Sequence, residues 1–221
     1  MSEQSSGKTI VIGSTDVSLK ISDVTERIIS GIMNDGVVEI VGIAESIFLV
    51  CSALNLSSEI AKVYLDQINF GYVDDVALGK VPAIYAHVTQ QETVNYERLV
   101  TEEEQAMDNI GDRTISVGHE IPMEKLVTRS LMALARFDEI KLIAAGGSIN
   151  EAINLSLKLE SGQLTRDPVG VKLFYLYSIN MRNDPAKKIS AVSIYLKKGI
   201  ATKPVDFVKL LKSVNQNKQV G

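Results

Sequence analysis

Six basic side chains surround a predicted hairpin near the end of the chain: Lys172, Arg182, Lys187, Lys188, Lys197 and Lys198. Arg182 and the Lys187-Lys188 pair flank the predicted turn, Asn183-Asp184-Pro185. Lys and Arg side chains bind nucleic acid by neutralising phosphates and releasing counterions. Aromatic rings stack on bases, and Tyr177 or Tyr195 would serve if exposed. The pattern predicts a surface that follows a phosphate backbone, but a charged, solvated turn that keeps a hairpin soluble is an alternative interpretation.

A second candidate site is the turn Gly146-Gly147-Ser148, which joins a predicted strand to a predicted helix. The free backbone N–H groups and the dipole of a helix N-terminus bind anions. Neither a Walker-type lysine nor a dinucleotide fingerprint accompanies the turn. A tight turn without a ligand is therefore the alternative interpretation.

Catalytic and metal-binding patterns are scarce in this sequence. It contains two histidines and one cysteine, and it lacks the patterns HExxH, CxxC and GxSxG, so neither a metal-ligand set nor a nucleophile with an evident base is predicted. We expect a protein that is not an enzyme, with no catalytic residue, no metal and no cofactor. Cys51 lies among Leu49, Val50, Ala53 and Leu54 and is predicted to be a small core residue.

The distribution of apolar residues also bears on location. Residues 1–8 are polar and lack the apolar core of a signal peptide, and no apolar run approaches the roughly 18 residues of a membrane span. We therefore expect a cytoplasmic protein without a membrane partner.

Charge is distributed unevenly along the 221 residues. The net charge is −4, but residues 1–90 carry 5 basic and 11 acidic side chains, residues 91–113 carry 2 and 7, and residues 114–221 carry 16 and 9. The three segments therefore have net charges of −6, −5 and +7. This asymmetry indicates that the two halves face different partners, or each other.

Four sequence blocks recur in the same order, which indicates an internal duplication. Residues 9–13 match 114–118, 39–44 match 139–144, 63–69 match 174–180, and 83–88 match 191–196. Ser46-Ile47 also matches Ser148-Ile149.

Each repeat is predicted to have the order β-α-β-α-β-β. In the first, apolar periodicity predicts strands near residues 9–13, 37–43, 60–72 and 82–90, and helices over 22–33 and 45–57. Asn34-Asp35-Gly36 is typical of a helix C-terminus. In the second, Pro122 suits the first turn of a helix. The buried face of that helix is predicted to contain Leu126, Val127, Ser130, Leu131 and Leu134, and that of the next helix, which opens at Gly147-Ser148, Ile149, Ala152, Ile153 and Leu157.

These patterns predict an α/β protein with two tandem β-α-β-α-β-β domains. The first domain covers residues 1–90 and is acidic, and the second covers 114–199 and is basic. Residues 91–113 form an acidic linker, and residues 200–221 form a tail with a short amphipathic stretch at 205–211.

A β-α-β-α-β-β unit that opens on a short strand ending in Gly and closes on a long hairpin resembles the Alba domain of archaeal chromatin and of RNA-processing complexes. The best local match is residues 143–153, a strand, a glycine-containing turn and a helix. The resemblance implies a protein that binds DNA or RNA. It also implies that the two domains form an internal pseudo-dimer, in place of the homodimer that single Alba domains form.

The sequence departs from the Alba pattern where the family has paired lysines after the Gly of the first strand. Ser14-Thr15-Asp16 follows Gly13, and His119-Glu120 follows Gly118. His119 is a candidate to hydrogen-bond a phosphate in place of these lysines. The basic residue that the family has at the start of the second helix is also replaced, by Glu45 and by Gly147-Ser148.

The first-repeat hairpin offers Asp74, Asp75 and only Lys80, so we expect the second-repeat hairpin to bind nucleic acid. The main hypothesis is a non-enzymatic, Alba-type nucleic-acid-binding protein whose binding residues lie on the second repeat. The alternative is an interaction module that pairs with another Alba-like or ribonucleoprotein subunit and barely contacts nucleic acid. An enzyme that holds a phosphorylated ligand at Gly146-Gly147 is a minor third alternative.

Overall fold

The computed structural model describes residues 8–13, 18–75, 78–90, 113–165, 167–181 and 183–200, together with Phe207 and Leu211. The chain divides into two compact units. The first comprises Met1–Tyr96 and Pro204–Gly221, and the second comprises Glu97–Lys203. The C-terminal residues therefore group with the first unit, although the second unit precedes them in the sequence.

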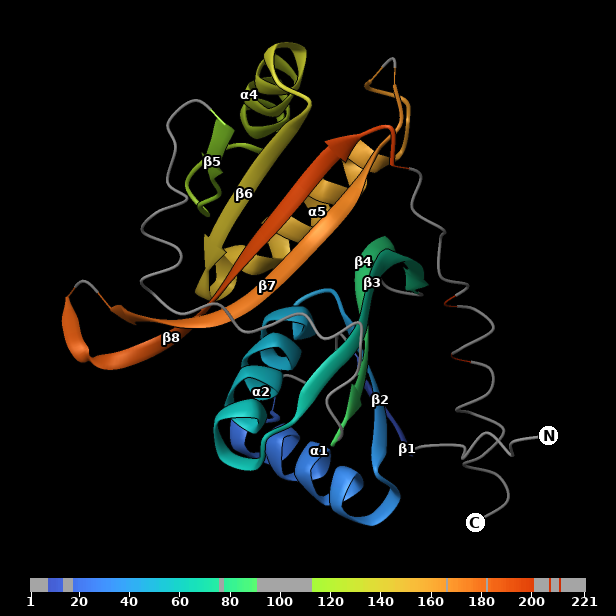
Figure 1. The fold of residues 1–221 in the computed structure, drawn as a ribbon, viewed down its shortest axis with the longest axis vertical. Helices are drawn as coiled ribbons and strands as arrows, with labels where there is room; N and C mark the ends of the chain where they lie inside the picture. The colour runs from blue at the N-terminus through green and yellow to red at the C-terminus, as the bar shows by residue number, and fades with distance from the viewer. Residues whose placement is uncertain are drawn as a thin grey trace. The chain divides into compact units, whose positions relative to one another are not determined.

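Within the described residues, the first unit is a four-stranded sheet with two helices (Figure 1). Its elements are β1 (Lys8–Ile12), α1 (Ile21–Asp35), β2 (Val37–Ile43), α2 (Ser46–Ala61), β3 (Tyr64–Asp75) and β4 (Gly79–Thr89). The strand order is β1-β2-β4-β3, with β1 parallel to β2 and the other neighbours antiparallel. Helix α1 provides the crossover that two adjacent parallel strands require.

The described part of the second unit repeats this order. Its elements are β5 (Thr114–Ser116), α4 (Met123–Arg136), β6 (Glu139–Ala145), the 3₁₀ turn η2 (Gly146–Ser148), α5 (Ile149–Glu160), β7 (Val169–Met181) and β8 (Asp184–Lys198). The strand order is β5-β6-β8-β7. The predicted fold class, two tandem α/β domains of β-α-β-α-β-β order, is therefore confirmed. The pairing of the two domains as a pseudo-dimer stays a prediction.

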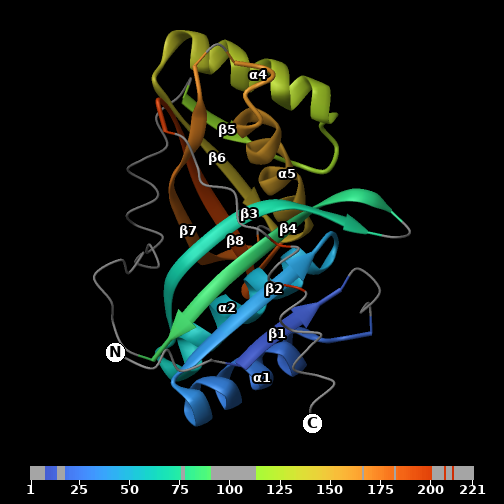
Figure 2. The same cartoon turned by 90° about the vertical axis from the view of Figure 1, so that its right-hand side faces the viewer.

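In the first unit, α1 and α2 pack on one face of the sheet (Figure 2). Helix α1 buries Ile28, Gly31 and Ile32, and a Cβ on Gly31 would lie 2.5 Å from Val38 of β2. Because side chains alternate along a strand, Val38 points to the helices and Glu39 points away from them. We call the face of each sheet opposite its helices the open face.

The observed ends of helices α1 and α2 can be compared with the ends predicted from the sequence. Gly36 ends α1 with a φ of 73° and donates its N–H to Ile32 O at 2.8 Å, which confirms the predicted terminus. The strand expected near residues 60–72 is present as β3, but its predicted start is wrong because α2 continues to Ala61 and β3 begins at Tyr64. Within the helix, the hydroxyl groups of Ser57 and Ser58 donate to the carbonyl oxygens of Ala53 and Asn55.

The predicted buried faces of the second unit are largely confirmed. All four residues expected in α5 are buried. In α4, Leu126, Ser130 and Leu134 are buried, whereas Val127 and Leu131 are only half-buried. Ala133 takes part in the buried face instead.

Strand register determines which residues of the two units are equivalent. Strands β2 and β6 have the same length, and each is followed by a residue with positive φ, Ala44 at 53° and Gly146 at 59°. Both hairpins carry a register shift at corresponding places, between Leu65 and Gln67 and between Val171 and Leu173. This register confirms three sequence matches, namely 9–13 with 114–118, 83–88 with 191–196, and Ser46-Ile47 with Ser148-Ile149.

The same register corrects the other two matches. Residues 39–44 are equivalent to 141–146, a shift of two from the sequence match, and residues 63–69 are equivalent to 169–175, a shift of five. Strands with alternating apolar residues resemble themselves after a shift of two, so sequence similarity alone does not fix their register. With the corrected register, Lys141 of the second unit is the equivalent of Glu39 in the first unit.

Candidate nucleic-acid interface

The β7–β8 hairpin extends beyond the rest of the second sheet (Figure 1). Strand β6 pairs with β8 as far as Ala145 and Ala191, whereas β7 and β8 remain paired as far as Met181 and Asp184. We call residues 178–190 the second arm. The expected turn, Asn183-Asp184-Pro185, extends too far along the chain, because Asn183 is in a turn but Asp184 and Pro185 already belong to β8. A proline is tolerated here because β8 has no partner on its β6 side at this position.

The basic residues expected on the second arm are partly described. Lys187 and Lys188 are exposed, and Lys188 pairs with Asn180. Arg182 lies outside the described residues. By sequence the second arm has three basic side chains and one acidic side chain, Asp184, so its net charge is +2.

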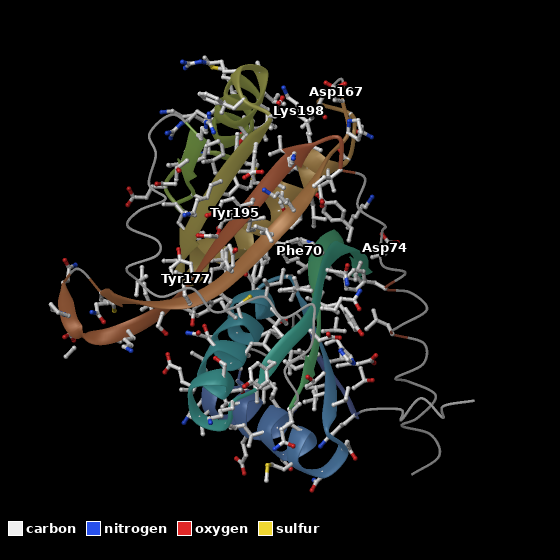
Figure 3. The ribbon with its side chains drawn as sticks, viewed as in Figure 1. Phe70, Asp74, Asp167, Tyr177, Tyr195 and Lys198 are labelled. Carbon is white, nitrogen blue, oxygen red and sulfur yellow. The ribbon has the colours of Figure 1, made fainter. Side chains whose placement is uncertain are left out.

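The other three predicted lysines lie at the opposite end of the hairpin. The nine residue-to-residue steps from Lys188 to Lys197 span about 30 Å at about 3.3 Å per residue, and Figure 3 labels Lys198 at the end of the sheet away from the second arm. Lys172 Nζ donates to Glu139 Oε2 at 2.8 Å, and Lys198 Nζ lies 3.7 Å from Asp138 Oδ1. The five described basic residues therefore do not form one cluster, because the prediction grouped them by sequence and took no account of the length of the strands.

The first unit has an equivalent arm at the end of β3 and β4. We call residues 72–82 the first arm. Lys80 occupies the position of Lys188, but it pairs with Asp74 where Lys188 pairs with Asn180. Lys80 Nζ also lies 5.0 Å from the ring centroid of Tyr72. The first arm has one basic and two acidic side chains, a net charge of −1, so the two arms differ in sign of charge.

The open face of the second sheet combines a lysine with tyrosines. Lys141, from β6, is 5% exposed, and its Nζ lies 5.3 Å from the ring centroid of Tyr195. Tyr175 meets Tyr195 edge to face at 5.7 Å between centroids. Tyr177 is buried, and its hydroxyl lies 3.2 Å from Ser193 Oγ (Figure 3). Of the two tyrosines considered for stacking, Tyr177 is therefore covered and Tyr195 is half-buried.

The open face of the first sheet has acidic residues at the equivalent positions. Glu39 stands where the second unit has Lys141, and its carboxylate oxygens accept hydrogen bonds from Thr9 Oγ1 and Tyr85 OH, both at 3.0 Å. Burial, and then the charge of Glu39, raise the pKa of Tyr85. Asp66 stands where the second unit has Lys172 and lies 2.9 Å from His87 Nδ1. The charge asymmetry of the two halves thus extends to equivalent positions on their open faces.

Two separate sequence candidates, His119 and the Gly146-Gly147-Ser148 turn, lie together in the structure. A Cβ on Gly147 would lie 2.5 Å from His119 Nε2, and His119 Nδ1 lies 2.6 Å from Glu151 Oε1. Glu151 is in the first turn of α5 and brings a negative charge to the helix N-terminus, where an anion would bind. This charge opposes anion binding and favours the interpretation of a tight turn.

Two of these residues, Glu151 and Lys141, were not predicted from the sequence. Glu151 follows Ser148 at the Ser-x-x-Glu spacing that is typical of a helix start, and this spacing could have identified it. Lys141 is a charged residue in an alternating strand, where it must occupy the face opposite Ile140 and Leu142. The incorrect match of residues 39–44 with 139–144 concealed its equivalence to Glu39.

Cys51 is confirmed as a core residue. Its side chain is fully buried, and burial raises the pKa of its thiol to about 12. A thiol with this pKa forms little of the thiolate that acts as a nucleophile. Within the ranges that the structure describes, no group of three His, Cys, Asp or Glu residues is placed to hold a metal ion.

No helix among the described residues is long and apolar enough to cross a membrane.

Comparison with solved structures shows a likeness to ALBA1 from Trypanosoma brucei. The identity is 18%, the TM-score is 0.35, and the match covers 51% of this chain and 90% of that chain. No family model matches this sequence, and no curated protein matches it. The fold of the two units is established by their own element and strand order and not by this likeness.

Proposed function

We propose that this protein binds DNA or RNA without catalysis and that the second arm is its main phosphate-contacting element. The main support for this proposal is a difference between the two equivalent arms in the residue that pairs with the equivalent lysine. Lys188 pairs with the neutral Asn180, whereas Lys80 pairs with Asp74. A phosphate near Lys80 would meet the repulsion of that carboxylate, whereas a phosphate near Lys188 would not.

The shape of the second arm supports the same proposal. A two-strand hairpin that projects beyond its sheet can lie along a groove or a single strand, which a flat sheet cannot follow. Lys187 and Lys188 are exposed on this projection. Exposed lysines contribute little to folding, so their concentration here is better explained by a ligand than by stability.

The test measures binding to short duplex DNA and to single-stranded RNA by fluorescence anisotropy over a range of salt concentrations. The variant Arg182→Ala/Lys187→Ala/Lys188→Ala should flatten the slope of log K against log salt by about two to three units, because each lost phosphate contact removes about one. Its melting temperature should stay close to that of the parent protein.

Lys80→Ala is the matched control, because Lys80 occupies the equivalent strand position in the first unit. It should leave the slope nearly unchanged. If the triple variant binds like the parent while Lys80→Ala loses binding, the first arm and not the second contacts the nucleic acid, and the proposal is wrong.

A second candidate function is an interaction module that docks on basic partners. Glu39 and Asp66 favour it, because they replace Lys141 and Lys172 on the open face of the first sheet. Failure of the parent protein to bind either nucleic acid at low salt would support this function over nucleic-acid binding.

A further inference from the structure

Two side chains from the C-terminal part of the sequence, Phe207 and Leu211, pack on the open face of the first sheet. Phe207 is 2% exposed and belongs to a buried apolar cluster with residues of β2, β3 and β4. The other buried members are Val41, Ile43, Ala44, Val73, Val81, Ala83 and Tyr85. Leu211 packs against the same cluster. Two side chains from the end of the sequence thus complete a core that otherwise consists of residues from the first 85 positions.

Gly71 allows the Phe207 ring to approach the sheet. A Cβ on Gly71 would collide with the Phe207 ring edge at Cε2 and Cδ2. Gly71 lies on β3 and pairs with Ala83 of β4, so two small residues lie side by side beneath the ring. We call Gly71, Ala83, Val41, Val73 and Val81 the aromatic seat.

The second unit fills the equivalent position differently. Tyr177 pairs with Ala191 as Gly71 pairs with Ala83, and therefore stands where the first unit has glycine. Its own ring is buried, and its hydroxyl lies 3.2 Å from Ser193 Oγ. One domain therefore carries its aromatic ring on the sheet, whereas the other receives a ring from a distant segment.

The spacing of the two anchors indicates how the segment binds. Phe207 and Leu211 are both helical and four residues apart, so they lie on the same side of a helix. Asp206, Lys209 and Lys212 are interspersed with the apolar residues in this part of the sequence. This combination is typical of an amphipathic helix that binds in an apolar groove.

We propose that the aromatic seat is a docking site for a short amphipathic helix and that the chain's own C-terminal segment is its exchangeable ligand. A segment joined to its site by the same chain competes at an effective concentration in the millimolar range. A free copy of the segment should therefore bind weakly to the intact protein and much better when the internal anchors are removed. This inference does not depend on nucleic-acid binding.

The experiment uses the full chain and a fluorescent peptide with the sequence of residues 203–213. The variant Phe207→Ala/Leu211→Ala should bind the peptide at least tenfold more tightly than the parent protein does. A peptide that carries Phe207→Ala should lose most of this binding. Equal binding of the peptide to the parent and the double variant, or no binding to the double variant, would overturn the proposal.

A control variant adds Gly71→Tyr to Phe207→Ala/Leu211→Ala, which gives the first unit the aromatic residue that the second unit has. Its side chain should occupy the aromatic seat and abolish peptide binding. Circular dichroism spectra that match the parent protein would establish that the control is folded. Undiminished peptide binding to this folded control would show that the peptide binds elsewhere, and it would overturn the proposal that the aromatic seat is the docking site.

A second measurement needs no peptide and follows trypsin cleavage after Lys209, which lies between the two anchors in the sequence. In an otherwise unchanged chain, Gly71→Tyr should displace Phe207 and accelerate this cleavage by about tenfold or more, because proteolysis follows the population of the released segment. Cleavage after Lys62 at the end of α2 reports on unfolding of the domain and should stay at the rate of the parent protein. Unchanged cleavage after Lys209 would overturn the proposal.

Discussion

Side-chain volume is divided differently between sheet and helix at one equivalent pair of core positions in the two units, and this difference gives a quantitative prediction. Gly42 of β2 lies against α2, where an added Cβ would come within 2.8 Å of Val50 Cγ2 and 3.1 Å of Ile84 Cγ2. The second unit has Ala144 and Ala152 at the positions of Gly42 and Val50. Compared with the first unit, the second unit therefore has a larger residue on the sheet and a smaller residue on the helix.

Each single change should destabilise the first unit. Gly42→Ala overpacks the core, which costs about 1 to 3 kcal/mol, offset by up to about 1 kcal/mol because alanine loses less backbone entropy in a strand than glycine. Val50→Ala removes two buried methyl groups at about 0.8 kcal/mol each and leaves a small cavity, for a total of about 2 kcal/mol. With a net cost for Gly42→Ala near the middle of its range, about 1 to 2 kcal/mol, additive effects would cost the double variant about 3 to 4 kcal/mol.

The double variant should instead lose about 2 kcal/mol or less, because Val50→Ala removes the colliding Cγ2 and the new methyl group fills part of the cavity. The expected coupling is about 1 to 2 kcal/mol. The coupling free energy is measured by urea unfolding of the full chain, with far-UV circular dichroism as the signal. The unfolding transition of the first unit is identified as the one that Val50→Ala shifts. Additive losses, or a Gly42→Ala protein more stable than the parent, would refute the packing argument.

Three further predictions concern buried polar groups. Cys51 should resist thiol reagents in the native protein and react on unfolding, because at a pKa of about 12 only about one thiol in ten thousand is ionised at pH 8; an Ellman assay with and without denaturant measures this. Tyr177→Phe should cost about 1 to 2 kcal/mol in urea unfolding, because it leaves the hydroxyl of Ser193, which is 1% exposed, without its partner. The pKa of Tyr85 is raised in the folded state. The contribution of Tyr85 to stability is therefore complete below the pKa of the unfolded chain, about 10, and declines as the pH rises above that value. Melting temperatures between pH 8 and 11 should fall more steeply in the parent protein than in Tyr85→Phe.

The order of elements could be predicted from the sequence because local signals were consistent. Gly36 supplies a left-handed terminus after α1, and the apolar residues of α5 recur at helical spacing. These signals depend on neighbours within about one turn, so they survive without tertiary information.

Pairings between distant segments could not be predicted in the same way. A shift of two residues preserves the alternation of a strand, so Lys141 was not recognised as the counterpart of Glu39. His119 and Gly147 were separate candidates, and only the fold brings them together with Glu151. The amphipathic pattern at 205–211 was visible in the sequence, but nothing local to it indicates that Phe207 belongs to the core of the first unit.

The position of Phe207 in the chain has a consequence for biosynthesis. The first unit's N-terminal part ends at Tyr96, yet its core includes a residue about 110 positions later. At about 5 to 20 residues per second, a ribosome needs roughly 5 to 20 s to supply that residue after the rest of the domain has been made. During this interval the apolar residues around Gly71 have no Phe207 to cover them, and the second domain is synthesised meanwhile. The first domain to begin folding is therefore the last to be completed.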